Sequence, residues 1–190
     1  MRLYDMHRED FARRYPALKS FFESHAPLFA LFRLLSKAAV ILTYGMYAAG
    51  LVLVGLDIWN KGLSADGNVL LRLVGITVLP FAAFALCTAV RKGINAPRPY
   101  EMGIVPLIPK KTKGLSCPSR HTACVTAIAL SWLIISPPIG VIMVCAAVFI
   151  AFSRIVSGVH YPLDVLSGAV LSILVYGGGL LIFALVRTNL

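Results

Sequence analysis

The stretch TACVTAIALSWLIISPPIGVIMVCAAVFIAFS, residues 122–153, contains no charged side chain over 32 residues. A helix needs about 20 apolar residues to cross the hydrocarbon core of a bilayer, so the stretch is too long for one crossing. The segment Ser136–Pro138 interrupts it, because consecutive prolines cannot continue a helix. The stretch therefore predicts two membrane-spanning helices, over Ser119–Ile135 and Ile139–Val156.

Three further apolar runs predict additional crossings, namely Ala38–Leu56, Leu73–Val90 and Val165–Val186. Hydrophobic residues make up 58% of the 190 residues and charged residues only 14%, against about 25% charged in soluble domains. The mean hydropathy is +0.82. This composition excludes a soluble globular domain, a disordered chain, a coiled coil and a collagen-like fibre. It indicates an integral membrane protein.

The first 37 residues differ from the rest because charged side chains run through them. Apolar residues at positions 11, 15, 18, 22 and 29 fall near one helical face. This periodicity predicts an amphipathic helix lying on the membrane surface, with an ordinary polar lead-in as the alternative. We therefore divide the chain into an interfacial segment, 1–37, and a transmembrane domain, 38–190. The expected fold is all-α, a polytopic transmembrane helical bundle of about five spans plus an N-terminal amphipathic helix.

Charged and polar residues at the ends of the apolar runs form three clusters. They are Arg91–Pro99, Cys117–His121 and Ser153–Asp164. Ionisable groups beside or inside a membrane are costly, and by default they mark function. The first two clusters flank one loop, and the chain crosses the membrane twice before it reaches the third. All three clusters are therefore expected on the same side of the membrane.

The clusters carry an excess of cations, comprising Arg91, Lys92, Arg98, Arg120 and Arg154. Asp164 is the single nearby acid, and one carboxylate cannot neutralise five cations. Their mutual repulsion requires an anion, and the planar guanidinium group matches phosphate oxygens. The sequence predicts a phosphate pocket. Lys92 is the weakest member, because bases commonly end a span and anchor it to headgroups.

Two histidines supply reactive groups. His160 and Asp164 are four residues apart, which lets the carboxylate orient the imidazole. An imidazole so oriented can attack phosphorus. His121 lies at the mouth of another span and can protonate the leaving oxygen. No acidic cluster is present to hold magnesium, so neither a metal nor another cofactor is expected.

The three clusters resemble the three-part signature of the type-2 phosphatidic-acid phosphatase superfamily. In the first motif Arg91 takes the place of the family's lysine, six residues before Arg98-Pro99. In the second, Arg120 replaces a glycine within Pro118–His121. The third motif, from Ser153-Arg154 through His160 to Asp164, matches without a change. The resemblance covers residues 73–186.

The resemblance implies that His160 is the nucleophile and forms a phosphohistidine, that Asp164 orients it, and that His121 is the general acid. It implies phosphate binding by Arg91, Arg98, Ser119, Arg120 and Arg154, although Ser119 also suits the cap of the third span. Membrane members of the family act on phosphatidic acid, phosphatidylglycerol phosphate or polyprenyl diphosphates. We therefore expect an integral membrane phosphatase or diphosphatase acting on such a lipid. The alternative is a catalytically silent membrane protein that binds phospholipid headgroups.

Arg120 leaves two interpretations open. Its guanidinium group either holds a second phosphate, which favours diphosphate substrates, or points to the headgroup layer, so that only its backbone N–H contributes.

The charge distribution bears on partners and on orientation. The net charge of +10 does not indicate nucleic acid, because the bases lie between apolar runs. The expected partners are a phosphorylated lipid substrate and membrane lipids; the oligomeric state is unknown. We expect a multi-pass protein of a bacterial cell membrane. Of the 18 Lys and Arg residues, all but Lys61, Arg72 and Arg187 lie on the side of the clusters, which favours a cytoplasmic site. The resemblance implies the outer face, where bacterial membrane members usually act.

Overall fold

The computed structural model describes residues 2–62 and 67–188. These residues form α-helices and one short 3-10 helix, with no strand among them. In chain order they are α1 (Arg2–Ser24), α2 (Ala26–Lys61), α3 (Gly67–Ile76), α4 (Val78–Ile94), η1 (Pro99–Met102), α5 (Arg120–Ile135), α6 (Pro137–Val156) and α7 (Pro162–Thr188). The two predicted segments, 1–37 and 38–190, include a few positions outside the described residues, namely Met1, 63–66 and 189–190.

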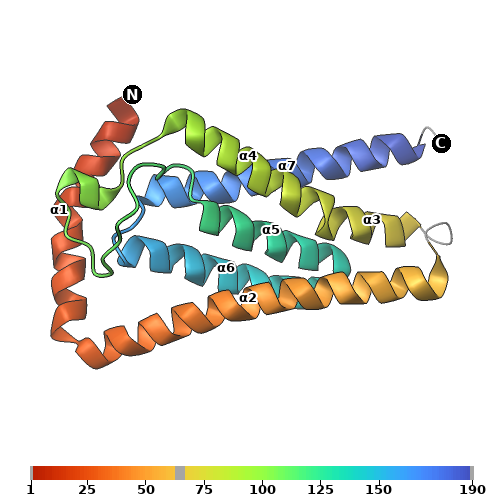
Figure 1. The fold of residues 1–190 in the computed structure, drawn as a ribbon, viewed down its shortest axis with the longest axis horizontal. Coiled ribbons are helices and arrows are strands. Elements are labelled where there is room, and N and C mark those ends of the chain that lie inside the picture. Colours follow the sequence, from red (N-terminus) through yellow and green to blue (C-terminus); the bar gives the residue numbers. More distant parts are fainter. Residues whose placement is uncertain (1, 63–66, 189–190) are drawn as a thin grey trace.

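Helices α2, α6 and α7, together with the combined stretch Asn68–Met102, are long and apolar enough to cross a membrane. Helix α5 is a shorter apolar helix of 16 residues. These elements lie side by side along the long axis of the molecule (Figure 1). Their outer faces expose large apolar side chains, including Ile41 and Phe81 at 73% and 71% exposure. The prediction of an all-α transmembrane bundle is confirmed.

Helix α5 lies at the centre of the bundle, between α6 and the pair α4 and α7 (Figure 1). Its apolar side chains pack against Met143, Ala147 and Ile150 of α6. The indole N–H of Trp132, 1% exposed, donates to the carbonyl of Met46 in α2 at 3.1 Å. Because neighbouring helices surround α5 on most sides, its position in the bundle is fixed by burial. The first residues of α5 are therefore held in a defined place.

The second predicted span, Leu73–Val90, is divided between two helices that meet at Thr77. Pro80 explains the break, because proline has no N–H to donate to the carbonyl four residues earlier. That carbonyl belongs to Ile76, and it accepts a hydrogen bond of 3.0 Å from the Tyr47 hydroxyl instead. The preceding carbonyl, of Gly75, accepts hydrogen bonds from two further helices, from the hydroxyls of Ser131 and Tyr176 at 3.0 and 2.9 Å.

The N-terminal helix α1 lies across one end of the bundle (Figure 1). It is amphipathic, as expected: Phe11, Tyr15 and Phe22 are buried, whereas Arg13 and Arg14 are exposed. Its buried face packs on Tyr161, on Ile104 of the loop between α4 and α5, and on Ile155 of α6.

The bend between α1 and α2 lies at His25 rather than near residue 37, where we drew the boundary of the interfacial segment. Pro27 stands in the first turn of α2, a position that suits proline because the missing N–H is unpaired there in any case. Residues 26–37 therefore belong to the same helix as the first span. Arg33 and Lys37 thus lie on α2, beside the bundle, and not on α1.

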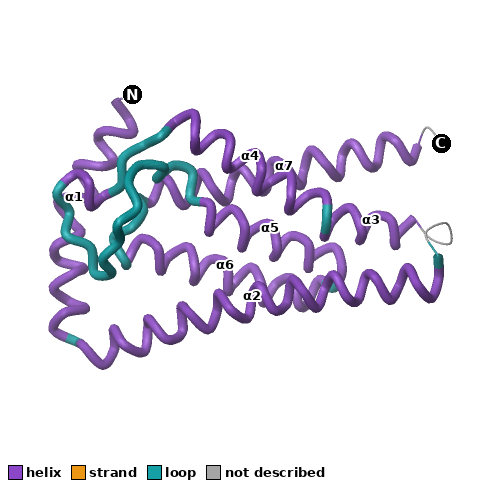
Figure 2. Tube along the Cα trace, viewed as in Figure 1, coloured by secondary structure: helices purple, strands orange, loops and turns teal. Residues whose placement is uncertain are grey.

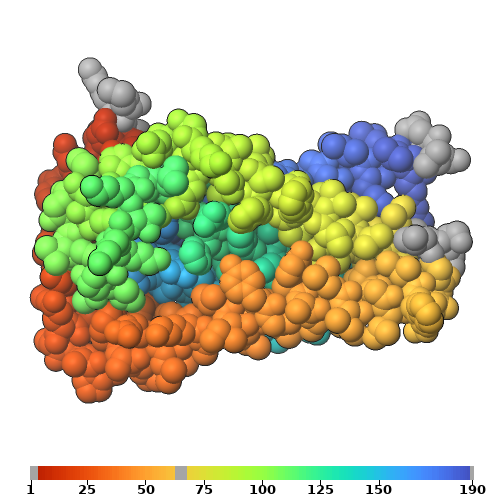
Figure 3. All heavy atoms as spheres, in the orientation of Figure 1, coloured from red at the N-terminus to blue at the C-terminus, as the bar shows by residue number. Residues whose placement is uncertain are grey.

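One end of the molecule gathers all the elements that bear the three clusters. Figure 2 shows the long loop between α4 and α5 at this end, beside α1. The space-filling view shows α1 and this loop closing the end together (Figure 3). The ends of α4 and α6 and the starts of α5 and α7 meet here (Figure 1). At the other end, α2 ends at Lys61 and α7 carries Arg187 in its last turn.

Candidate active site

The structure brings residues of all three clusters to the end of the bundle beneath α1 and the long loop. Arg91 lies in the last turn of α4, Ser119 precedes α5, and Arg154 lies in the last turn of α6. His160 lies just before α7 and Asp164 in its first turn. The ends of rigid helices thus carry most of the side chains that we singled out.

His160 and Asp164 form a buried pair. Their side chains are 3% and 0% exposed, and His160 Nδ1 lies 3.6 Å from Asp164 Oδ2. The Ser116 hydroxyl donates a hydrogen bond to the same Oδ2 and lies 3.4 Å from His160 Nδ1. Because these groups occupy the Nδ1 side of the ring, Nε2 is the nitrogen left for chemistry.

The carboxylate of Asp164 is held from several directions. The Tyr4 hydroxyl donates to Oδ1 at 2.7 Å, and the backbone N–H of Tyr161 donates to Oδ2 at 3.0 Å. Neither Tyr4 nor Ser116 was among the residues predicted from sequence. Ser116 stands just before the second motif, but Tyr4 carries no motif. Its position on the predicted amphipathic helix gave no sign of its partner.

Close packing of α7 on the start of α5 fixes the second motif against the third. The backbone N–H of Ser119 donates to the carbonyl of Asp164 at 2.7 Å. Gly168 allows this approach, because a Cβ there would lie 2.5 Å from the Ser119 carbonyl oxygen. Ser119 is buried, and its hydroxyl accepts a hydrogen bond of 3.1 Å from Thr122. It makes no side-chain capping hydrogen bond.

Arg98 is 5% exposed and is held by the long loop. Its Nε donates to the carbonyl of Gly114 at 2.9 Å, and a terminal nitrogen donates to that of Val159 at 3.4 Å. Glu101 closes the loop by accepting from the backbone N–H groups of Arg98 and Gly114, at 2.9 and 2.7 Å. The guanidinium group is thereby fixed close to the segment that bears His160.

The surroundings of His160 favour its neutral form. Burial of the imidazole is the main cause of the lowered pKa of His160, and the charges of Arg98 and Arg91 act in the same direction. Asp164 opposes them. A neutral imidazole has a free lone pair, so this environment keeps a nucleophile available.

The other predicted acid–base residue, His121, is half-buried at the start of α5. It lies within electrostatic range of Arg154, Lys110 and His160. Lys110 is a loop cation that we did not predict. Burial lowers the pKa of Lys110, and so do the charges of Arg154, Arg98 and Arg91. A further base therefore stands near the predicted phosphate ligands.

Two predicted residues are exposed, unlike the buried members of this group. Lys92 is exposed on α4. Arg120 is also exposed, and its guanidinium carbon lies 5.6 Å from the centre of the Phe84 ring. Arg120 shares a small pocket with His121, Tyr44 and Phe84. The Arg120 side chain thus lies against α4, whereas its backbone stays next to Ser119.

The fold and the site together define a class: polytopic helical membrane proteins with a buried carboxylate–histidine pair and several arginines at one end of the bundle. The family model of the PAP2 superfamily matches residues 70–188. The chain belongs to the PAP2 superfamily, which confirms the resemblance seen in the sequence.

Two relatives and one solved structure show this likeness. An undecaprenyl-diphosphatase of Sulfolobus acidocaldarius is 34% identical over 101 residues, 51% of this chain and 49% of the relative. Undecaprenyl-diphosphatase BcrC of Bacillus subtilis is 31% identical over 135 residues, 71% of this chain and 67% of the relative. The chain thus matches about half of the first relative and two thirds of the second. The crystal structure of Aquifex aeolicus LpxE has a TM-score of 0.50 and 26% identity, covering 80% of this chain and 93% of that one.

Proposed function

We propose that this chain is a membrane phosphatase that hydrolyses a lipid phosphate or diphosphate through a phosphohistidine on His160. The observation that carries the proposal is the buried pair of His160 and Asp164 near Arg91 and Arg98. The family supports a phosphatase. The relatives named undecaprenyl-diphosphatases favour a polyprenyl diphosphate as the substrate class.

In the first step, Nε2 of His160 attacks the terminal phosphorus. A P–N bond forms while the P–O bond to the leaving group breaks, and His121 gives its proton to the leaving oxygen. The imidazole becomes positively charged as it is phosphorylated, and Asp164 beside Nδ1 stabilises that charge. Arginines around the phosphate stabilise the charge on its equatorial oxygens.

In the second step, water attacks the phosphohistidine. Neutral His121 accepts a proton from the water, the P–N bond breaks, and inorganic phosphate leaves. His160 is neutral again and His121 protonated, as at the start, which requires the bound phosphate anion to offset the nearby charges of Arg154 and Lys110. No step needs a metal ion, and the described residues contain no cluster of three or more His, Cys, Asp or Glu that would suit one.

Phosphate release from the purified protein in detergent tests the proposal. We expect release from at least one of phosphatidic acid, phosphatidylglycerol phosphate and a polyprenyl diphosphate. The His160→Ala variant should release none, and substrate with a radiolabelled phosphate should label wild-type protein but not this variant. His121→Ala should slow phosphoenzyme formation, by about 10²- to 10⁴-fold if general acid catalysis has its usual weight. Folded wild-type protein that releases phosphate from no lipid would instead support the silent headgroup-binding alternative.

A further inference from the structure

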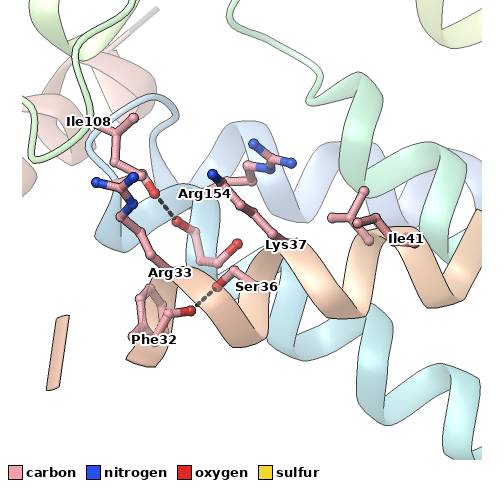
Figure 4. Close-up of a pocket in the computed structure, with 10 residues that line it drawn as sticks. Phe32, Arg33, Ser36, Lys37, Ile41, Ile108 and Arg154 are labelled. Atoms are coloured by element: carbon pink, nitrogen blue, oxygen red, sulfur yellow. Dashed lines mark hydrogen bonds between the residues drawn. The ribbon is translucent and has the colours of Figure 1, made fainter. Parts of the chain in front are cut away.

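A second group of cations surrounds a pocket of about 340 Å³ between α2 and α6 (Figure 4). Its charged lining residues are Arg33 and Lys37 of α2 and Arg154 of α6. No acidic side chain is among the lining residues, and none of the three bases has an ion-pair partner among the described residues. Nearby serine hydroxyls of Ser36 and Ser157 donate to helix carbonyls. The bases are therefore the groups available to an anion.

The sequence of α2 places Arg33 and Lys37 on one face, because residues four apart lie one above the other on a helix. Like charges at this spacing repel each other. Arg154 of α6 faces the same space from the opposite wall. Three converging cations without an acid are stabilised by a bound anion, and phosphate suits the guanidinium groups best.

Arg154 connects this pocket to the candidate active site. It belongs to the third sequence motif, and it lies within electrostatic range of His121. Its Nε is buried and has no hydrogen-bond partner among the described residues. Buried donors of this kind are nearly always satisfied, so an oxyanion next to Arg154 would supply the missing partner. Through Arg154 the pocket thus lies near His121 of the candidate active site rather than forming a remote surface site.

The pocket changes from charged to apolar along α2. Val40 and Ile41 continue its lining beyond Lys37, roughly 10 Å from Arg33 at 1.5 Å per residue. Figure 4 shows Ile41 further along α2, away from the charged ends of Arg33 and Arg154. Ile41 is 73% exposed. A ligand with an anionic head and an apolar tail fits this order of side chains.

We infer that this pocket binds the second phosphate of a lipid diphosphate, with Arg33 and Lys37 as specificity-determining residues. The inference rests on the proposed function. When the terminal phosphate is transferred to His160, the bond between the two phosphates breaks and the leaving group is a lipid monophosphate. Arg33 and Lys37 stabilise the negative charge that develops on it. A lipid monophosphate places no such group in the pocket.

The experiment compares farnesyl diphosphate with farnesyl monophosphate, which share one tail and differ by one phosphate. The variant is Arg33→Ala with Lys37→Ala. We expect kcat/KM for the diphosphate to fall at least tenfold and that for the monophosphate less than threefold. The charge-conserving variant, Arg33→Lys with Lys37→Arg, should keep most of the preference. A matched control, Arg13→Ala with Arg187→Ala, removes two exposed bases outside the pocket and should not change the ratio.

A binding experiment distinguishes failure of this inference from failure of the proposed function. Dissociation constants for both farnesyl probes and for inorganic pyrophosphate are measured on His160→Ala protein, with and without the Arg33 and Lys37 changes. A lipid diphosphate in the pocket is supported, even if no turnover is found, by two results together. The Arg33 and Lys37 changes should weaken binding of farnesyl diphosphate but not of the monophosphate, and without these changes the diphosphate should bind more tightly than pyrophosphate. Equal effects on both farnesyl probes, or no effect on either, would overturn the inference, whatever the activity. A melting temperature close to that of wild type would confirm that the variants are folded.

Discussion

The hydroxyl of Tyr4 donates a 2.7 Å hydrogen bond to Oδ1 of Asp164, although the two residues are 160 positions apart. Burial raises the pKa of Tyr4, and the Asp164 charge adds to this effect, so the phenol remains a donor at neutral pH. Helix α1 is thus part of the candidate active site as well as a helix that lies across the bundle end. We therefore expect Tyr4 to act through Asp164 as a positioning residue for His160.

Replacing Tyr4 with Phe should therefore lower kcat with little change in KM. A hydrogen bond to a charged group contributes about 1.5–3 kcal/mol, so we expect a loss of at least tenfold. The matched control is Tyr100→Phe, which removes a hydroxyl that donates to the carbonyl of Thr112 in the loop. A change in KM alone, or an equal loss in the control, would show that Tyr4 does not position Asp164.

Inhibition by orthovanadate should distinguish the proposed mechanism from metal-assisted hydrolysis. Vanadate mimics the five-coordinate transition state of transfer to His160 and should inhibit at low concentration. EDTA should leave phosphate release unchanged, since no step uses a metal ion. Loss of activity in EDTA that magnesium restores would contradict this mechanism.

The pH dependence of kcat/KM should report the lowered pKa of His160. Its ordinary value is 6.5, and protonation of Nε2 removes the nucleophile. The acidic limb assigned to His160 should therefore lie below pH 6.5. An acidic limb centred above that value would mean that Asp164 outweighs burial and the charges of Arg98 and Arg91.

The stability of the folded protein should also depend on the pKa of His160. Because the pKa of His160 is lower in the folded than in the unfolded protein, the unfolded chain takes up the proton first as pH falls. The contribution of His160 to stability is complete above the ordinary pKa of 6.5 and declines below it. The melting temperature of His160→Gln protein should fall less steeply than that of wild type below pH 6.5.

The orientation of the site in the membrane can be measured with single cysteines. We introduce them at Lys111, exposed on the long loop, and at Lys61, exposed at the other end, in a background without Cys87, Cys117, Cys124 and Cys145. The excess of bases on the loop side predicts that a membrane-impermeant maleimide labels position 61 on intact cells and spares position 111. Labelling at 111 but not at 61 would place the site on the outer face.

The sequence was most informative where a local rule decides the structure. Pro137 and Pro138 divide the long apolar run, and α6 begins at Pro137. Pro80 carried a similar signal for the break at Thr77, which we missed because hydropathy continues across it. Counting crossings correctly predicted that helix ends bearing Arg91, Arg154 and Asp164 share one end of the bundle.

What the sequence did not predict depends on how α1 lies. The contact between Tyr4 and Asp164 requires a helix that turns across the bundle end, and no spacing rule links positions so far apart. The same holds for Arg33 and Lys37. They resembled ordinary bases of an interfacial segment, and the bend at His25 places them on α2, facing α6.

The break between α3 and α4 has a mechanical consequence. The carbonyls of Gly75 and Ile76 are held by hydroxyls from three other helices, those of Tyr47, Ser131 and Tyr176. Both carbonyls belong to the last turn of α3, so these bonds fix the end of α3 from which α4 continues. From Val78, α4 runs roughly 20 Å at 1.5 Å per residue to Arg91 in its last turn. The break at Pro80 is thus tied to three other helices, and we expect the position of Arg91 at the end of the bundle to depend on these hydrogen bonds in its middle.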